Sequence, residues 1–292
     1  MSHPANDASP VLVTGATGNT GRALIDALNE RGAPVRAMVR GDADRARLPA
    51  DVPAVAGDFD DPGSIAAALK GAGRAYLVTP SSEQAEAQQL RFADLAAEAG
   101  VRHLVVLSQL AASEHSPVRF LRYHAVVERH VRELGIGYTF LRPNLFFQGL
   151  FAFAGPIAAQ GQFYAPVGDA PVSAIDVRDI AAVAAVALTE TGHEDATYTL
   201  TGPAAITHAQ IAAALSAALG REITFVDVPP EAFADNLRGV LPPWQVEGLL
   251  EDYAHYRRGE AALVSPAVAE ITGRPPIDIG RFARDYAGAF SG

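Results

Sequence analysis

The chain has 292 residues, of which 49% are hydrophobic and 19% are charged, and its formal net charge at pH 7 is −10. This composition is typical of a globular protein with a large buried core, and it excludes a disordered or fibrous chain. The acidic balance is the wrong sign for a nucleic-acid-binding surface. The sequence contains no cysteine, which rules out disulfides, thiolate metal sites and a thiol nucleophile.

The N-terminal segment bears on localisation. Residues 1–9, MSHPANDAS, are polar and lack the apolar core of a signal peptide. The sequence also has no run of about 18 apolar residues, the length that a membrane-spanning helix needs. We therefore expect a soluble, cytoplasmic protein.

In the first half of the chain, short apolar runs alternate with helix-length segments. This rhythm predicts βαβ units around a parallel sheet, with helices on both faces of the strands. Gly32, Gly71, Gly100 and Gly135 stand where the helices are expected to stop. The strands are expected at residues 11–14, 35–40, 53–56, 75–79, 103–108 and 138–142.

After Pro143 the composition changes. Residues 144–171 are rich in aromatic residues and glycine and poor in charge, which is typical of binding loops. Further on, Thr207 and Gln210 form a capping box that predicts the start of a helix at His208. We expect an α/β protein: a Rossmann-type doubly wound parallel sheet with a smaller α+β C-terminal lobe. The expected sheet domain spans 9–150, with 172–190 returning to it, and the lobe spans 151–171 and 191–292.

The strongest motif is TGATGNTG, residues 14–21, which follows the first expected strand and opens the first helix. The first glycine permits a tight turn, the second lets the backbone approach a pyrophosphate, and the third lets the helix pack closely on the sheet. Backbone N–H groups at the positive end of the helix can then hold phosphates. The alternative is a plain strand-to-helix turn, but the context favours dinucleotide binding. The expected contacts are Gly15, Thr17, Gly18, Asn19, Thr20 and Gly21.

The second expected strand ends in Arg40, at the position where an NAD-selective protein offers a carboxylate to the ribose 2′-hydroxyl. A guanidinium there favours a 2′-phosphate, and Arg36 on the same strand face could assist it. Asp42 is close enough to serve NAD instead, and both arginines can also be solvated edge residues. On balance the sequence favours NADP(H) over NAD(H).

These residues resemble the NmrA-like branch of the atypical short-chain dehydrogenases/reductases, which includes NAD(P)H-dependent quinone reductases and dinucleotide-sensing regulators. The similar segments are TGATGNTG, VRAMVR, GDFDDPGSI, LVTP, HLVVLS, YTFLRPNLFFQ, SAIDVRDIA and TGRPPIDIGRFARDYA, and they span nearly the whole chain. For Asp58, a turn or helix cap before Pro62 is an equally good interpretation. The resemblance implies that Asp58 and Phe59 border the adenine. It also implies that Thr79 and Pro80 line the cofactor beside the ribose, and that Pro143 and Asn144 lie near the nicotinamide.

Other members of the wider superfamily use a serine followed by Tyr-x-x-x-Lys, in which the lysine lowers the pKa of the tyrosine. Ser108 ends the fifth expected strand, where that serine belongs and can contact the cofactor, and Tyr123 lies 15 residues further on. The fourth residue after Tyr123 is Val127, however, and the only lysine of the chain, Lys70, lies in a distant part of the sequence. The standard proton relay is therefore unsupported. Tyr123 and its neighbour His124 stay as the catalytic candidates.

His124 and Glu128 are four residues apart on a helix expected over 118–134, so they should share a face. They form either a paired imidazole or an ordinary surface ion pair, and the second is more common. Asp176 and Asp179 are expected to cap a helix N-terminus and not to act in catalysis. The histidines show no metal-ligand spacing, so we expect no metal site.

The aromatic segment predicts where an acceptor binds. Gln148 can supply a polar contact to a flat apolar molecule, although the aromatic side chains of this segment could instead form an interface between lobes or subunits. The aromatic residues that suit such a molecule are Phe146, Phe147, Phe151, Phe153, Phe163 and Tyr164. Hydride transfer to a quinone needs no strong general acid, so positioning and exclusion of water would suffice. We expect an NADPH-dependent reductase that acts on a quinone-like or other carbonyl acceptor without flavin or metal.

A second interpretation is a non-catalytic NADP(H)-sensing regulatory protein of the NmrA type, for which the missing Tyr-x-x-x-Lys pair is also expected. The same absence disfavours sugar-nucleotide epimerase or dehydratase chemistry. A homodimer and a regulatory protein partner are both compatible with the sequence. Neither a nucleic-acid nor a membrane partner is indicated.

Overall fold

The computed structural model describes residues 9–291, which divide into two compact units. Unit 1 comprises residues 9–108, 123–142 and 180–198, and unit 2 comprises residues 109–122, 143–179 and 199–291. The chain passes between the units five times, so neither is a continuous segment. The first eight residues, which form most of the polar N-terminal segment, lie outside the described part of the chain. The domain boundaries expected from the sequence stay a prediction.

Unit 1 is built on a sheet with the strand order β3-β2-β1-β4-β5-β6-β8. The pairs from β3 through β6 are all parallel, and the order changes direction between β1 and β4. All six predicted strands are present, with ends that differ by at most two residues. The strands are β1 Val11–Val13, β2 Val35–Val39, β3 Ala54–Ala56, β4 Arg74–Leu77, β5 His103–Leu107, β6 Gly137–Pro143 and β8 Ala196–Leu200.

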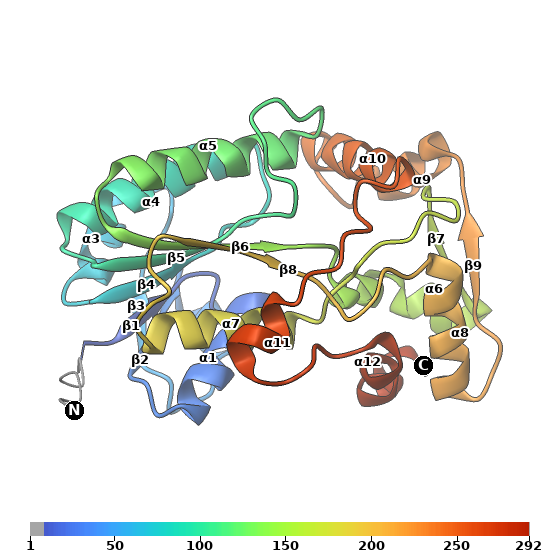
Figure 1. Cartoon of the computed structure of the whole chain (residues 1–292), viewed down its shortest axis with the longest axis horizontal. Coiled ribbons are helices and arrows are strands. Elements are labelled where there is room, and N and C mark those ends of the chain that lie inside the picture. Colours follow the sequence, from blue (N-terminus) through green and yellow to red (C-terminus); the bar gives the residue numbers. More distant parts are fainter. Residues whose placement is uncertain (1–8, 292) are drawn as a thin grey trace. The chain divides into compact units, whose positions relative to one another are not determined.

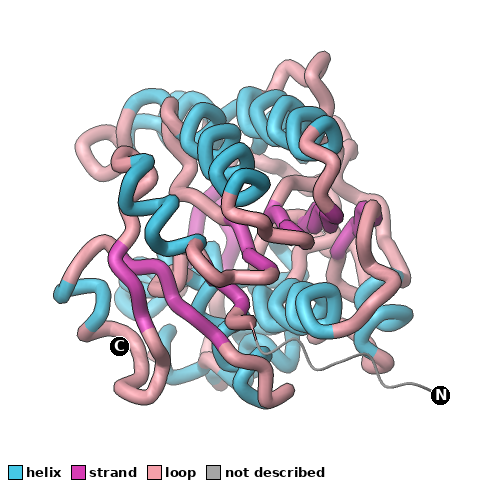
Figure 2. The backbone as a smooth tube through the Cα atoms, turned by 90° about the vertical axis from the view of Figure 1, so that its left-hand side faces the viewer, coloured by secondary structure: helices cyan, strands magenta, loops and turns pink. Residues whose placement is uncertain are grey.

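Helices cover both faces of this sheet. In Figure 1, α3, α4 and α5 lie on one side of the strands, and α1 and α7 lie on the other. Helices also flank the magenta strands in Figure 2. The arrangement confirms the predicted Rossmann-type α/β fold. The helices with residues in unit 1 are α1 Asn19–Glu30, α2 Asp42–Arg45, α3 Pro62–Leu69, α4 Ala85–Glu98, α5 Arg119–Glu133 and α7 Val177–Thr189.

The sequence rhythm has a simple physical basis in unit 1. All five residues of β5 are buried, because an apolar strand between two helix layers has no face left for water. On the side of α3 to α5, Phe92 and Phe140 are fully buried in one hydrophobic cluster. The four predicted helix stops all have positive φ angles, between 67° at Gly32 and 81° at Gly100, which a glycine adopts without strain.

Unit 2 contains a two-stranded parallel sheet of β7 Gln162–Ala165 and β9 Thr224–Asp227. The predicted capping box opens α8, since the Thr207 hydroxyl accepts from the N–H of Gln210 at 3.2 Å and the Gln210 side chain accepts from the N–H of Thr207 at 2.8 Å. Phe163, Phe282 and Phe290 are fully buried in the core of this unit. Its helices are η1 Phe147–Phe153, α6 Ala154–Gln160, α8 His208–Leu219, α9 Pro230–Leu237, α10 Pro243–Arg257, α11 Ala267–Thr272, α12 Ile279–Asp285 and η2 Ala287–Phe290.

Two buried carboxylates near the start of α7 have structural partners. Asp176 accepts from the backbone N–H of Arg178 at 2.9 Å and from its guanidinium, as a cap at a helix start does. Asp179 is not a cap of this kind. It accepts from the Arg274 guanidinium at 3.0 Å and from the N–H of Ile277 at 2.7 Å, so it fastens the C-terminal segment within unit 2.

None of the described helices is both long enough and apolar enough to span a bilayer.

His103, at the start of β5, is buried without charge. Its Nε2 lies 2.8 Å from Oγ1 of Thr139, and that hydroxyl donates to the carbonyl of His193 at 2.6 Å. The imidazole Nε2 must therefore carry the proton, and the buried Nδ1 has no partner among the described residues. Burial is the main cause that lowers the pKa of His103 from 6.5 to about 4.

We expect His103→Gln to weaken the loss of stability in acid. Between pH 6.5 and 4, His103 is protonated in the unfolded chain but not in the folded protein. Its contribution to the free energy of unfolding is therefore fully present above that range and is lost as the pH drops. The substitution should remove roughly 2 kcal/mol of the change in unfolding free energy between pH 7 and 5, measured by urea denaturation. His115→Gln, at an exposed position, is the matched control variant. Parallel curves for H103Q and wild type would contradict this assignment.

Candidate functional site

The turn after β1 is held against β4, where the strand order changes direction. The buried Thr14 hydroxyl accepts from the N–H of Val78 at 2.8 Å and donates to the Tyr76 carbonyl at 3.0 Å. Gly15 follows with a φ of +56°, and a Cβ there would lie 2.6 Å from a methyl group of Val78. Ligands of open α/β sheets bind outside the carboxyl ends of the strands at such a switch point.

The start of α1 forms a cradle of backbone. Gly18 is its N-cap and has no side chain to satisfy the first N–H groups of the helix, and no acidic residue lies in the first turn. A Cβ on Gly21 would stand 2.2 Å from the carbonyl oxygen of Gly15, so the helix approaches the turn as only glycine allows. Open N–H groups of Asn19 and Thr20 at the positive end of a helix suit the diphosphate of a dinucleotide.

Two guanidiniums gather beside this cradle. Arg40 donates to Asp44 at 3.2 Å, and its side chain is 74% exposed. Arg47, which the sequence analysis did not select, donates to the carbonyl of Thr17 in the glycine loop at 3.2 Å and lies 3.5 Å from the same Asp44 carboxylate. The pair places positive charge next to the loop. The spacing of Arg40, Asp44 and Arg47 around the short helix α2 is the signal that could have found Arg47.

Arg36 does not join this group. The guanidinium of Arg36 donates to the carbonyls of Ala68 and Lys70 at 3.2 and 2.8 Å, so it caps the end of α3, and the expected help to Arg40 is wrong. Asp42 lies in the first turn of α2, where a carboxylate complements the helix dipole.

Asp58 and Phe59 follow β3. Asp58 accepts from the N–H of Asp60 at 3.0 Å, so it forms a turn, whereas the N-cap of α3 is Asp61. The turn interpretation of Asp58 therefore holds at the level of geometry. The ring of Phe59 packs 5.8 Å from that of Phe92. Contacts of either residue with an adenine stay a prediction.

Thr79 and Pro80 follow β4 beside the glycine loop. The Thr79 hydroxyl accepts from the Gln89 amide at 2.8 Å. Gln89 is 1% exposed, and its buried carbonyl oxygen has no partner among the described residues. Gln89 is thus a positioning residue for Thr79 that the sequence did not reveal, because an amide within a helix carries no visible motif.

Ser108 lies at the end of β5 in a buried charged network. Its hydroxyl donates to Glu128 at 2.6 Å, and the same carboxylate accepts two bonds from Arg142, at 2.8 and 2.6 Å, and one from Arg132 at 3.1 Å. Glu128 is 1% exposed, so these donors compensate for its desolvation. The network fixes the rotamer of Ser108 and leaves its oxygen able to accept a further hydrogen bond.

The expected pair of His124 and Glu128 is wrong in both of its forms. Both residues are buried, and Glu128 is occupied by Ser108 and the two arginines, while Nδ1 of His124 has no partner among the described residues. Burial, with a smaller contribution from the Arg142 charge, lowers the pKa of His124 from 6.5 to about 3, so the imidazole is neutral at pH 7. Its ring lies 4.1 Å from that of Tyr123.

A valine occupies the helix position that holds the lysine in proteins with Tyr-x-x-x-Lys. Val127 is fully buried in the hydrophobic cluster of unit 1, and Lys70 is exposed at the end of α3. The fourth position after Tyr123 therefore holds a core side chain and not an ammonium group. Tyr123 and His124 stay predictions as catalytic residues.

In unit 2, Asn144 follows Pro143 at the end of β6. Its amide hydrogens go to the hydroxyl of Ser173 and the carbonyl of Ala261, both at 2.8 Å, and its oxygen accepts from the N–H of Leu145 at 2.8 Å. The side chain is 4% exposed. It therefore ties three segments of unit 2 together, and its place near a nicotinamide stays a prediction.

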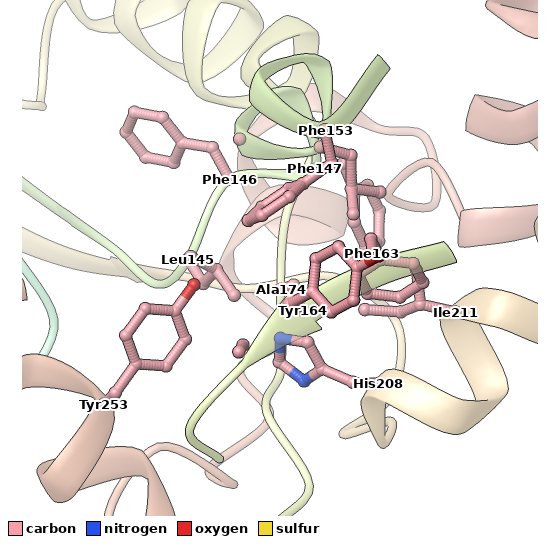
Figure 3. Close-up of a pocket in the computed structure, with 13 residues that line it drawn as sticks. Leu145, Phe146, Phe147, Phe153, Phe163, Tyr164, Ala174, His208, Ile211 and Tyr253 are labelled. Atoms are coloured by element: carbon pink, nitrogen blue, oxygen red, sulfur yellow. The ribbon is translucent and has the colours of Figure 1, made fainter. Parts of the chain in front are cut away.

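A pocket lies in the aromatic part of unit 2 (Figure 3). The empty space in and around it, including space that is open to solvent, is about 420 Å³. Phe146 and Phe147 line it, as predicted for an acceptor site, although the ring of Phe146 points away from the other labelled side chains in Figure 3. The remaining lining residues are Leu145, Gly149, Leu150, Phe153, Phe163, Tyr164, Ala165, Ala174, His208, Ile211 and Tyr253.

Gln148 does not line the pocket, so the expectation that it supplies the polar contact to an acceptor is wrong. Its amide donates to Asp176 at 2.9 Å and accepts from the N–H of Val177 at 3.1 Å. The polar side chains of the lining are Tyr164, His208 and Tyr253. Tyr164 belongs to the aromatic segment itself. His208 and Tyr253 carry no visible signal in the sequence, because α8 and α10 reach that segment only in the folded unit.

The described residues contain no cluster of three or more His, Asp or Glu side chains that could hold a metal ion.

The sheet order and the glycine cradle define a Rossmann-type α/β protein. A model of the NmrA-like family matches residues 7–269, so the chain belongs to that family and the resemblance is confirmed. It is 37% identical over 282 residues to NAD(P)H azoreductase of Xenophilus azovorans, covering 96% of this chain and 99% of the relative.

Two further relatives are similar over most of the chain. A (4-alkanoyl-5-oxo-2,5-dihydrofuran-3-yl)methyl phosphate reductase of Streptomyces griseus subsp. griseus is 38% identical over 282 residues, 96% of this chain and 99% of the relative. The NADPH-dependent quinone oxidoreductase of Escherichia coli, solved in complex with NADPH, has a TM-score of 0.84 at 27% identity, covering 95% of this chain and 99% of that one. Two of these proteins are reductases by name, and the third is an oxidoreductase.

The close packing at Gly21 leads to a prediction about NADPH binding. We expect Gly21→Ala to lower NADPH affinity by at least about tenfold, because a Cβ at 2.2 Å from a backbone carbonyl forces the helix and the turn apart. Isothermal titration calorimetry measures the affinity, and circular dichroism checks the fold. Gly155→Ala is the matched control, since a Cβ there meets nothing within 4 Å. Unchanged binding by G21A would contradict the phosphate site.

Proposed function

We propose that the protein is an NAD(P)H-dependent reductase of the NmrA-like family. The observation that carries the proposal is the uncapped N-terminus of α1 over Gly15, which offers backbone N–H groups to a diphosphate at the switch point of the sheet. The relatives named as NAD(P)H azoreductase and NADPH-dependent quinone oxidoreductase support it. When bound, the cofactor supplies a hydride.

We propose further that NADPH is preferred over NADH. Arg40 and Arg47 lie beside the glycine loop, and one carboxylate, Asp44, is shared between them. A single carboxylate leaves net positive charge for a 2′-phosphate, whereas a ribose hydroxyl would need an acceptor there.

The acceptor is proposed to be quinone-like or another carbonyl compound, bound in the aromatic pocket of unit 2. Reduction of a quinone consumes one hydride and one proton and yields a hydroquinone and the oxidised cofactor. The hydride goes to the acceptor, and the proton can come from water, so no flavin, metal or strong acid is required. The chain then binds, orients and shields the reactants. Among the candidate residues, His124 is uncharged near pH 7, so it supplies no imidazolium proton there.

The direct test combines binding and turnover. We expect calorimetry to detect NADPH binding and absorbance to show NADPH oxidation with simple quinones. Binding without turnover on a panel of quinones and azo compounds would indicate the sensor interpretation. Absence of binding to either nicotinamide cofactor would overturn the proposal as a whole.

The cofactor preference has a separate test. Arg40→Gln and Arg47→Gln should each raise the Kd for NADPH about tenfold, because each removes a charge-assisted contact, and should leave the Kd for NADH nearly unchanged. Arg36→Gln is the control on the same strand, since its guanidinium is held by two backbone carbonyls. Equal losses for NADPH and NADH would show that the arginines stabilise the loop and do not recognise the 2′-phosphate.

A further inference from the structure

The pocket of unit 2 is lined without any charged side chain. Its thirteen lining residues include no Lys, Arg, Asp or Glu. A phosphate or sulfonate that entered it would lose hydration and find no opposite charge, which costs several kcal/mol for an ion. An uncharged lining of this kind favours uncharged ligands.

His208 is the most deeply buried polar group of the lining. It is 4% exposed, and its Nδ1 has no hydrogen-bond partner among the described residues. Its ring lies 5.1 Å from that of Phe225 and 6.3 Å from that of Phe163. Burial lowers its pKa to about 4 despite the Asp227 carboxylate nearby, so the imidazole is uncharged at pH 7. An unsatisfied buried nitrogen at a pocket wall has a hydrogen bond left to make.

Tyr253 supplies a second polar group. It projects from α10, and its hydroxyl points toward Leu145 in Figure 3. Burial and the neighbouring Asp252 carboxylate raise the pKa of Tyr253, so its hydroxyl keeps its proton and can donate a hydrogen bond. The hydroxyl of Tyr164, by contrast, is hydrogen-bonded to Gln160 at 2.8 Å.

Resting on the proposed function, we propose that the pocket selects uncharged, flat ring compounds that carry a hydrogen-bonding oxygen or nitrogen, and that His208 and Tyr253 are the specificity-determining residues that bind this atom. Acceptors with a phosphate or sulfonate group are rejected. The substrate class thus differs from that of the Streptomyces relative, whose name specifies a phosphate ester.

The first experiment compares naphthoquinone with naphthoquinone sulfonate. Equilibrium dialysis of the full chain, with and without NADP⁺, measures binding of each compound. We expect the sulfonate to bind on the order of 100-fold more weakly. Similar affinities for the two compounds, or tighter binding of the sulfonate, would overturn the proposal.

A charge placed in the lining should reverse this selectivity. Tyr164 is half-buried, so in Tyr164→Arg the guanidinium can reach both the pocket and water. We expect this variant to gain at least about tenfold in affinity for the sulfonate and to lose affinity for the quinone. Tyr198→Arg, a half-buried tyrosine of unit 1, is the matched control and should keep the wild-type ratio. A wild-type ratio in Y164R would count against the pocket as the binding site.

The polar contacts are tested separately from packing. His208→Phe and Tyr253→Phe keep a ring at each position and remove the hydrogen-bonding atom. We expect each to weaken naphthoquinone binding about 5- to 10-fold while leaving naphthalene binding unchanged. Equal losses for the two compounds would show a structural role only, and no loss would remove both residues from specificity.

The outcomes also separate this proposal from the function on which it rests. Failure of NADPH to bind, with normal selectivity between the two naphthoquinones in dialysis, overturns the reductase and keeps the pocket assignment. Normal NADPH oxidation with equal kcat/KM for neutral and sulfonated quinones keeps the reductase and overturns the pocket assignment.

Discussion

The close approach of α1 to the turn that precedes it is the constraint on which the candidate cofactor site depends. With glycine at position 21, the first turn of the helix lies directly over the carbonyl of Gly15, and with glycine at position 18 the helix begins without a side-chain cap. Thr14 then locks the turn to β4. The N–H groups keep one fixed direction as a result, and a fixed set of donors is what an anion site requires.

In unit 1, the buried carboxylate of Glu128 holds Ser108 in place at the end of β5. In relatives with Tyr-x-x-x-Lys, a lysine supplies positive charge; here Val127 fills that helix position with a core side chain. Glu128, one residue later, instead binds Ser108 and Arg142. Removing a single partner from such a network leaves a buried charge uncompensated, so its members depend on one another.

Local patterns in the sequence were sufficient for the scaffold, because strand and helix ends depend on nearby residues. Apolar runs located the six strands, and the glycines that end the helices have the expected backbone angles. Predictions of side-chain roles were wrong or incomplete where those roles depend on tertiary contacts. Gln148 stands among phenylalanines in the sequence, yet the fold turns its amide to Asp176 and the start of α7. Conversely, His208 and Tyr253 come from helices far along the chain and meet the aromatic segment only in the folded unit.

The interleaved path of the chain has a consequence for biosynthesis. Most residues of helix α7 and strand β8 belong to unit 1, where β8 forms one edge of the sheet. The ribosome makes both elements only after residues 143–176 of unit 2. Until then the edge of β6 and the sheet face beneath Ile180, Val183 and Ala187, which are fully buried in the finished protein, stay open. An unpaired edge and a bare apolar face are targets for chaperones and for aggregation during synthesis. A chain that ends before residue 177 lacks both α7 and β8, so this edge and this apolar face stay exposed in it.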